Sequence, residues 1–332
     1  MKTRLLDLLC LAVLCVILTL GLWPFHSPAN GVAWLPNCNG LQFGRYSTVI
    51  GSSPFSLPSA SASVEIWLQP RSDGDSATLL AFPSFSLRQS ETDLELRTAD
   101  KAVLYVNGVF RRSRPVLVTV TSGIHGTAVY IDGALARTAP RLRFFANGFT
   151  GRLVLGDSPG QPDNWSGRML GLALYGSELT PAQVLRHDAP AIARYSFDEC
   201  AGRIVHDRSG SGVDLYIPPK YMVLDKFFLE PFWREFRMSR STWRDILKNV
   251  VGFIPFGACS FACLSAHRLR RAALIAVLLG FLVSLTIEVL QAYLPTRDSG
   301  TTDLFTNTLG TYFGVLAWRA VAFRIHPPGV VE

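Results

Sequence analysis

The apolar residues of this chain gather near its two ends, and this distribution constrains the fold more than any other feature. One apolar run covers Leu5–Leu22, and a second apolar region extends from Ile246 towards the C-terminus. Runs of this length can cross the hydrocarbon core of a bilayer. The residues between them have an ordinary soluble composition. The sequence therefore predicts an integral membrane protein with a folded domain between its first and second spans.

Four membrane helices are predicted. The first lies within residues 1–24, and the others cover about 246–264, 272–294 and 304–323. A cleaved signal peptide is the alternative for the first run, because Gly31-Val32-Ala33 is a small-x-small site. The run is longer than the apolar part of most signal peptides, which favours an uncleaved span.

Basic residues flank these spans on one side. Lys2 and Arg4 precede the first span, residues 268–271 hold three arginines between the second and third, and Arg319 and Arg324 end the fourth. Such flanks are typical of the cytoplasmic side. We therefore expect a multi-pass protein of the inner or plasma membrane, with both termini cytoplasmic and the soluble segment extracytoplasmic. The formal net charge is +7, but the Lys/Arg blocks typical of nucleic-acid binding are missing, so no nucleic-acid partner is predicted.

The soluble segment, residues 37–219, consists of short alternating runs bounded by turn residues, as in an all-β sandwich. Asp132-Gly133 between two such runs predicts a hairpin turn. Thr180–His187 is a short helix candidate with Thr180 as N-cap and Pro181 in the first helical position. The strands expected most strongly are Ala62–Gln69, Val116–Thr121, Thr127–Ile131 and Arg152–Leu155.

Three stretches of this segment resemble concanavalin A-like, laminin G-like domains: VTVTSGIHGTAVYIDGALA (118–136), LVLGDSPGQPDNWSGRMLGLALYGSELTPAQV (153–184) and RYSFDECAGRIVHDRSGSGVDLYIP (194–218). The resemblance implies a jelly-roll sandwich. Domains of this kind often bind sugars, sometimes with calcium. Four residues of one predicted loop are the candidates for a glycan or calcium site: Asp157, Asp163, Asn164 and Trp165. The alternative is that these are ordinary turn residues.

The six cysteines fall into two groups. Cys38 and Cys200 flank the soluble segment and would form a disulfide if that segment lies outside the cytoplasm. The other four cysteines lie within apolar runs, as small buried thiols do. No Cys/His cluster has zinc spacing, so calcium is the only cofactor considered and no other metal site is predicted.

The C-terminal part, residues 245–325, resembles the VanZ-like family. DILKNVVGFIPFG (245–257) and SLTIEVLQAYLPTRDSGTTDLFTNTLGTYFG (284–314) carry that family's motifs in order. The β-domain would then be a large insertion after the first helix. The resemblance implies a role in the bacterial envelope, since members are linked to resistance to glycopeptide antibiotics, specifically teicoplanin. The family's biochemical activity is unsettled.

Polar residues recur at helical spacing in the predicted spans, and we expect them to form one membrane polar pocket near the outer ends. Ionisable residues at such depth are costly and need a partner, which makes them functional candidates. Glu288 is suited to accept a proton or a cationic group, and Arg297 to hold an anionic group. Pairing between helices, including Glu288 with Arg297, is the alternative. The residues of the predicted pocket are Asp245, Asn249, Glu288, Gln291, Arg297, Asp303 and Asn307.

Residues 220–244 precede these spans and contain Phe228, Phe232 and Phe236 at intervals of four, which predicts an amphipathic helix lying on the outer leaflet. A linker helix packed on the β-domain is the alternative.

The sequence therefore favours an envelope protein without enzymatic activity that recognises a cell-wall or lipid-linked glycan, with membrane lipid as a second partner. The first alternative is a membrane enzyme with Glu288 as acid/base and Asp303 and Arg297 assisting, although no nucleophile motif supports it. The second alternative is an adhesion or sensing module that binds a protein.

Overall fold

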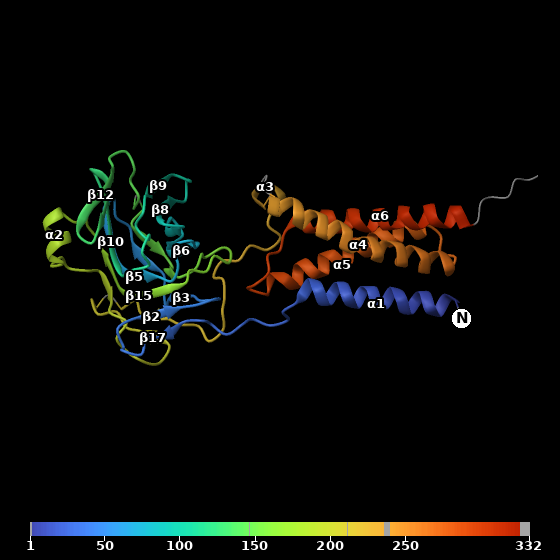
Figure 1. Cartoon of the computed structure of the whole chain (residues 1–332), viewed down its shortest axis with the longest axis horizontal. Coiled ribbons are helices and arrows are strands. Elements are labelled where there is room, and N and C mark those ends of the chain that lie inside the picture. The colour runs from blue at the N-terminus through green and yellow to red at the C-terminus, as the bar shows by residue number, and fades with distance from the viewer. Residues whose placement is uncertain (1, 146, 211, 236–239, 326–332) are drawn as a thin grey trace, which may run out of the picture. The chain divides into compact units, whose positions relative to one another are not determined.

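The computed structural model describes residues 2–145, 147–210, 212–235 and 240–325 (Figure 1). The chain divides into two compact units, each with its own core. The first is Ser27–Asp225, which contains the strands, and the second combines Met1–His26 with Lys226–Glu332 and contains the long helices. The two units are described separately below.

Two eight-stranded antiparallel sheets form the β unit. In the first sheet the order is β1-β2-β15-β5-β10-β11-β12, with β16 beside β15. Its strands are β1 (Ala33–Trp34), β2 (Leu41–Phe43), β5 (Ala62–Pro70), β10 (Val116–Gly123), β11 (Gly126–Ile131), β12 (Ala134–Ala139), β15 (Gly167–Tyr175) and β16 (Ala193–Tyr195).

In the second sheet the order is β17-β18-β3-β14-β6-β7-β8-β9, and β13 and β4 form a separate pair. Its strands are β3 (Val49–Gly51), β6 (Ser76–Phe82), β7 (Phe85–Ser90), β8 (Asp93–Thr98), β9 (Val103–Val106), β14 (Val154–Leu155), β17 (Ile204–Val205) and β18 (Leu215–Tyr216), and the pair is β4 (Phe55–Leu57) and β13 (Phe149–Gly151). One buried core cluster takes side chains from strands of both sheets, so the architecture is an all-β sandwich.

The alternation along β5 shows why these residues form a sandwich. Val64, Ile66 and Leu68 are completely buried in the core between the sheets, while Glu65 and Trp67 point to the opposite face. Strand side chains alternate in this way because the backbone repeat is two residues. One face of β5 therefore supplies core, and the other is available for a surface site.

Two local predictions are confirmed. Asp132 and Gly133 connect β11 and β12 with φ of 51° and 80°, the left-handed values that a tight hairpin turn requires. Helix α2 (Pro181–Arg186) begins after Thr180, whose side chain and that of Gln183 form a reciprocal capping box.

Cys38 and Cys200 form a disulfide with their Cα atoms 4.6 Å apart. The bridge connects positions 162 residues apart in the sequence. It joins the loop after β1 to the segment after β16, near the two ends of the β unit.

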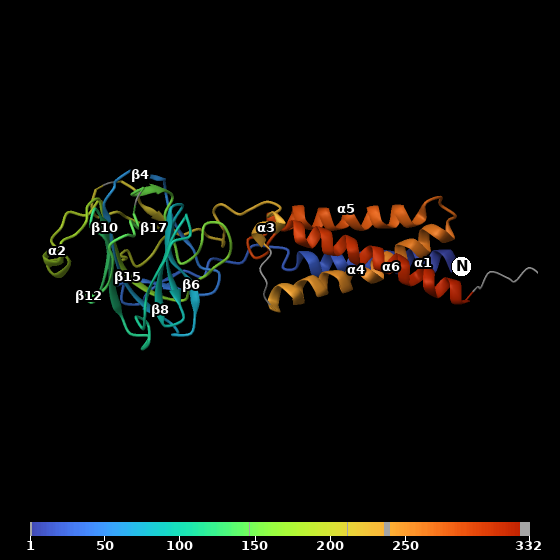
Figure 2. The same ribbon diagram turned by 90° about the horizontal axis from the view of Figure 1, so that it is seen from above.

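Four long helices make up most of the other unit, and two views show them running side by side (Figures 1 and 2). They are α1 (Lys2–Leu22), α4 (Arg240–Ala266), α5 (Ala272–Ala292) and α6 (Thr301–Ile325), with a single helical turn, α3 (Phe232–Glu235), before α4.

The prediction of four membrane spans is corrected to three. Among the described residues, the helices long and apolar enough to cross a membrane are Thr3–Leu22, Thr242–Ala266 and Ala272–Ala292. Helix α6 has sufficient length but is more polar, because Asp303, Asn307 and several threonines interrupt its apolar residues.

The amphipathic helix expected across residues 220–244 is also corrected. Residues 220–225 belong to the β unit. Phe228 and Leu229 lie in a bend, and Leu229 has a left-handed φ of 48°, so the chain around them is not helical. Phe236 lies outside the described residues, and among the described residues of this segment helical structure is limited to α3 and the start of α4.

Helices α4 and α6 approach each other closely at three glycines. A Cβ added to Gly257 would lie 2.0 Å from the carbonyl oxygen of Thr311, and one added to Gly310 would lie 2.2 Å from that of Val250. At Gly314 the corresponding distance is 2.1 Å to the carbonyl oxygen of Ile254. No larger residue fits at these positions, so the small-xxx-small spacing of Gly310 and Gly314 on α6 allows close packing.

Candidate functional site

A polar cavity of about 620 Å³ lies among the helices of the helical unit. Apolar side chains of α1 and α4 form much of its wall, including Val13, Ile17 and Phe253. Six of the seven residues of the predicted pocket line it: Asn249, Glu288, Gln291, Arg297, Asp303 and Asn307. The seventh, Asp245, lies outside the cavity.

Asp245 is more than half exposed, and it accepts a hydrogen bond from Lys248 Nζ at 2.9 Å. The two residues are three apart on α4, so this is a local surface ion pair of small energetic value. The helical spacing of Asp245 and Asn249 was correct, but Asp245 lies at the exposed side of the first turns of α4.

Hydrogen bonds between helices set the positions of the two asparagines. Asn249 Nδ2 on α4 donates to Asp303 Oδ1 on α6 at 2.7 Å. Asn307 Nδ2 on α6 donates to Ser284 Oγ on α5 at 2.9 Å. These bonds join three helices around the cavity.

Glu288 is almost completely buried, with 1% of its surface exposed. Its Oε2 atom accepts a hydrogen bond at 2.8 Å from the backbone N–H of Gly300, in the loop before α6. Burying a carboxylate requires such compensation, because the ion loses its water. The bond therefore ties the loop between α5 and α6 to the floor of the cavity.

Gln291 and Arg297 both bind the carboxyl end of α1. Gln291 Nε2 donates to the carbonyl oxygen of Gly21 at 2.8 Å, and Arg297 Nε donates to that of Trp23 at 2.8 Å. The Arg297 guanidinium also contacts the carbonyl oxygen of Leu20 at 3.3 Å. The last carbonyl groups of a helix lack intrahelical partners and favour cations, so Arg297 caps α1. This contact replaces the pairing of Arg297 with Glu288 that the sequence suggested.

Two acceptor atoms of the cavity lack partners within the described part of the chain. They are Gln291 Oε1 and Asn307 Oδ1, and both are buried. A buried acceptor without a hydrogen bond costs about 1–3 kcal/mol. A ligand that brings O–H or N–H groups into the cavity would satisfy both.

Lys226 was not among the residues predicted from the sequence. It caps the carboxyl end of α5. Its Nζ donates to the carbonyl oxygens of Gln291 at 2.7 Å and Leu294 at 2.6 Å. Desolvation by burial lowers the pKa of this amine. The signal that could have revealed it is weak, since a single lysine before a span has many possible roles.

In the β unit, the loop chosen as a glycan or calcium candidate is occupied by internal contacts. Trp165 is completely buried and donates from Nε1 to Gln89 at 2.8 Å, while Asn164 Nδ2 donates to the carbonyl oxygen of Ser47 at 3.3 Å. Asp163 forms an ion pair with Arg88. These contacts favour a structural role for the loop.

Asp157, the fourth candidate in that loop, is also completely buried. It accepts hydrogen bonds from the backbone N–H groups of Ser158 and Asp163 at 2.8 and 2.7 Å, and from the Tyr221 hydroxyl at 2.8 Å. Burial outweighs these bonds and raises the pKa of Asp157 to about 7.

A different surface of the β unit has the character of a binding site. A cavity of about 890 Å³ opens on the outer face of the first sheet. Trp67 is half exposed there, beside the Glu65 carboxylate on the same strand. The surrounding polar residues are Asp132, His187, Arg194 and Asp198. We call this surface the Trp67 groove.

Three side chains fix the Glu65 carboxylate at the floor of the Trp67 groove. Tyr175 donates its hydroxyl to Oε2 at 2.5 Å, and Thr119 donates to Oε1 at 3.3 Å. His187 Nδ1 lies 3.1 Å from Oε1. Burial and the adjacent Glu65 raise the pKa of Tyr175, so its hydroxyl stays protonated and donates.

The Trp67 groove was missed because its residues are far apart in the sequence. β5 lies between β10 and β15, and α2 brings His187, its C-cap in a left-handed conformation, over the sheet. The sequence signal that could have indicated the groove is the alternation of β5, in which Glu65 and Trp67 occupy the positions facing away from the core.

Comparison with known protein families assigns both units. Residues 204–323 match the VanZ/LLP1 family. Residues 43–185 match the concanavalin A-like lectin/glucanases superfamily. The chain thus combines a VanZ-like region with a concanavalin A-like domain, as the sequence motifs indicated. The VanZ/LLP1 match includes residues 204–225, which fold as part of the β unit.

Several solved structures are distantly similar. A putative carbohydrate binding protein from Bacteroides ovatus is 12% identical over 57% of this chain and 58% of its own, with a TM-score of 0.39. A pentraxin from Limulus polyphemus is 16% identical over 56% and 93%, with a TM-score of 0.37. Botulinum neurotoxin type C, whose cell entry depends on two ganglioside molecules, is 14% identical over 53% and 46%, with a TM-score of 0.38. A search of curated proteins gave no match.

Proposed function

We propose that this chain is a membrane protein of the bacterial envelope that recognises a lipid-linked glycan. The observation that carries the proposal is the polar cavity of the helical unit, where two buried acceptors, Gln291 Oε1 and Asn307 Oδ1, lack partners among the described residues. Its remaining wall is largely apolar. A ligand with hydroxyl or amide groups on an apolar chain matches both features.

The Trp67 groove supports the glycan part of the proposal. A half-exposed tryptophan gives a sugar ring an apolar face to stack on, and the neighbouring carboxylate, imidazole and guanidinium groups can hydrogen-bond its hydroxyls. The superfamily of the domain includes lectins, which is consistent with this use. Calcium is not required by this arrangement, since the acidic loop residues have internal partners.

The proposed orientation has the N-terminus in the cytoplasm and the β unit outside it. The Cys38–Cys200 disulfide supports this orientation, because disulfides persist in oxidising compartments. The basic residues between α4 and α5 favour a cytoplasmic position for that loop. A cytoplasmic C-terminus would need α6 to cross as well, so the proposal extends only from the N-terminus to α5.

The test measures binding of a lipid-linked cell-wall precursor to the full chain in nanodiscs. Gln291→Leu and Asn307→Leu should each lower the affinity by about tenfold, because each removes one acceptor. Asp245→Asn is the matched control, since Asp245 is polar but lies outside the cavity. If the precursor does not bind, or binds the leucine variants equally well, the cavity is not the lipid site.

The groove is tested with the soluble head group of the same precursor. Trp67→Ala should lower its affinity by about tenfold through loss of stacking, whereas Tyr105→Ala, an equally exposed aromatic position on the second sheet, should not. Saturable binding of a protein instead of a glycan at Trp67 would indicate an adhesion or sensing role.

A second function, catalysis on the lipid-linked ligand, is favoured by one observation: the Glu288 carboxylate lines the cavity while being almost completely buried. A carboxylate in this position could act as a general acid or base. The link to glycopeptide susceptibility would follow from either function, because both act on cell-wall precursors. This link is tested by measuring the minimal inhibitory concentration of teicoplanin in cells with and without the chain.

A further inference from the structure

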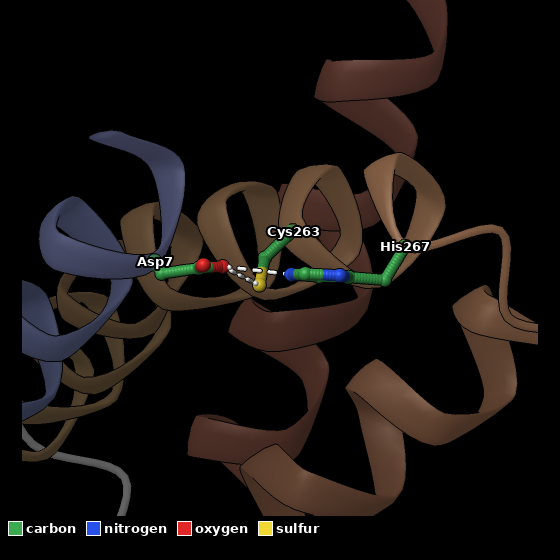
Figure 3. Close-up of side chains that lie close together, drawn as sticks. All are labelled: Asp7, Cys263 and His267. Carbon is green, nitrogen blue, oxygen red and sulfur yellow. Dashed lines mark hydrogen bonds and ion pairs between the residues drawn. The ribbon is translucent and has the colours of Figure 1, made fainter. Parts of the chain in front are cut away.

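Three potential metal ligands meet at one end of the helical unit (Figure 3). Asp7 lies in the second turn of α1, Cys263 in the last turn of α4, and His267 directly after it. Asp7 Oδ1 is 3.0 Å from Cys263 Sγ and 3.0 Å from His267 Nε2. Within the described part of the chain, this is the one group of three such residues whose ligand atoms lie within 4.8 Å of one another.

The helix repeat explains the pairing of Cys263 with His267. Residues four apart lie on one face of a helix, and the backbone N–H of His267 still bonds to the carbonyl oxygen of Cys263 at 3.1 Å. Helix α1 packs against α4, and this brings Asp7 opposite that face. The sequence shows no zinc spacing here because Asp7 and Cys263 are 256 positions apart.

The atoms are close to the spacing that zinc would impose. Zinc bonds of about 2.3 Å to sulfur and about 2.0–2.2 Å to nitrogen and oxygen, arranged tetrahedrally, separate the ligand atoms by roughly 3.3–3.7 Å. The two contacts of 3.0 Å therefore need to lengthen only slightly. A sulfur and an imidazole ligand disfavour calcium and magnesium, which prefer oxygen.

Charge also fits a divalent cation. On binding, the Cys263 thiol releases its proton and binds as thiolate, Asp7 binds as carboxylate, and the imidazole keeps its proton on Nδ1 and coordinates through Nε2. The two anionic ligands neutralise the two charges of the metal. This neutrality matters because Arg268, Arg270 and Arg271 follow immediately and would repel an uncompensated cation.

Solvent can reach the cluster. The side chains of Asp7 and His267 are 44% and 51% exposed, which provides an entry path and room for a water molecule as fourth ligand. In the proposed orientation this end of α1 and α4 faces the cytoplasm, where thiols stay reduced.

We propose that Asp7, Cys263 and His267 form a zinc site that ties the amino end of α1 to the carboxyl end of α4. With three protein ligands and one solvent ligand, the site leaves one position exchangeable. Bound metal would fix α1 against the rest of the helical unit. The hydrogen bonds of Cys263 and His267 to Asp7 hold the ligands together before the metal arrives.

The test uses the full chain in nanodiscs, reduced and treated with a chelator, and then titrated with Co²⁺ as a spectroscopic substitute for Zn²⁺. We expect one Co²⁺ per chain, with the charge-transfer absorption of a sulfur–cobalt bond, and its displacement by Zn²⁺. Cys263→Ser should abolish this absorption. His267→Gln and Asp7→Asn should weaken Co²⁺ binding on the order of tenfold or more.

Two control variants test whether the sulfur–cobalt absorption comes from Cys263. Cys259→Ser removes the thiol one turn earlier on α4, and Cys15→Ser removes an exposed thiol on α1. Both variants should keep the absorption and the stoichiometry. The proposal is overturned if folded wild-type chain shows no sulfur–cobalt absorption, or if the absorption survives in Cys263→Ser. It is also overturned if His267→Gln and Asp7→Asn bind Co²⁺ as tightly as the wild type.

Discussion

Asp157 shows how one buried side chain can couple the stability of the β unit to pH. Its carboxyl is completely buried, and burial raises its pKa to about 7, whereas an unfolded chain has the ordinary value of 3.8. Between these two values the unfolded state has lost the proton and the folded state has kept it. The contribution of Asp157 to the free energy of unfolding therefore falls as pH rises from about 4 to 7, and is constant above that range.

The corresponding prediction concerns Asp157→Asn, which is neutral at every pH. At pH 3.5, below both pKa values, its thermal midpoint should be close to that of the wild type, whereas at pH 8 the variant should be more stable, by about 4 kcal/mol at most. The β-sheet circular dichroism signal of the full chain measures this. Asp73→Asn, at an exposed position, is the control. An equal difference at both pH values would contradict the raised pKa.

Substitution of Glu288 distinguishes a binding function from a catalytic one. In Glu288→Gln the side-chain carbonyl can still accept the N–H of Gly300, so the fold and the cavity should persist. If the chain only binds its ligand, the affinity for the lipid-linked precursor should change by about threefold or less, a small free-energy difference. If Glu288 is a general acid or base, turnover of that precursor should fall by about 10²–10⁴-fold. We expect the first result; loss of measurable turnover would establish the enzyme instead.

At the scale of elements, the contact between α4 and α6 depends on glycines. Gly314→Leu should separate these helices, because even a Cβ at that position would lie 2.1 Å from the Ile254 carbonyl oxygen. Overpacking typically costs about 1–3 kcal/mol, so the thermal midpoint of the helical unit should fall clearly. Gly252→Ala is the control, since its Cβ would have no neighbour within 4 Å and alanine favours helix. Equal midpoints for both variants would argue against close packing.

Elements defined by local sequence were predictable, and contacts between distant elements were not. The Asp132-Gly133 turn and the Thr180 capping box depend on two to four adjacent residues, so the sequence specifies them directly. The Trp67 groove depends on the pairing of β5 with β10 and β15, which lie 50 to 100 residues away. No local pattern encodes such a register.

The cavity of the helical unit was partly predictable from the sequence. Helical spacing and family motifs selected seven residues, and six of these line the cavity, because the helix repeat fixes which side chains share a face. Their partners were not predictable: Arg297 binds carbonyl groups at the end of α1 instead of Glu288. The number of spans was overestimated because α6 is long enough to cross a membrane although its composition is more polar.

At the scale of the whole chain, the two units require different environments. The helical unit exposes apolar side chains such as Leu5, Leu20 and Leu278, which lipid can cover. The β unit has its own core and a disulfide, as an extracytoplasmic domain does. The proposed orientation, in which α1 and α4 cross the membrane in opposite directions, satisfies both requirements.

This orientation predicts the outcome of cysteine labelling in a background without the four free thiols. Ile124→Cys, at an exposed position between β10 and β11, should react with a membrane-impermeant maleimide in spheroplasts. Arg270→Cys, between α4 and α5, should react only after the membrane is permeabilised, because the positive-inside rule puts this loop in the cytoplasm. The reverse pattern would put the β unit in the cytoplasm. The glycan would then have to be a cytoplasmic precursor, and the zinc cluster would face the oxidising side.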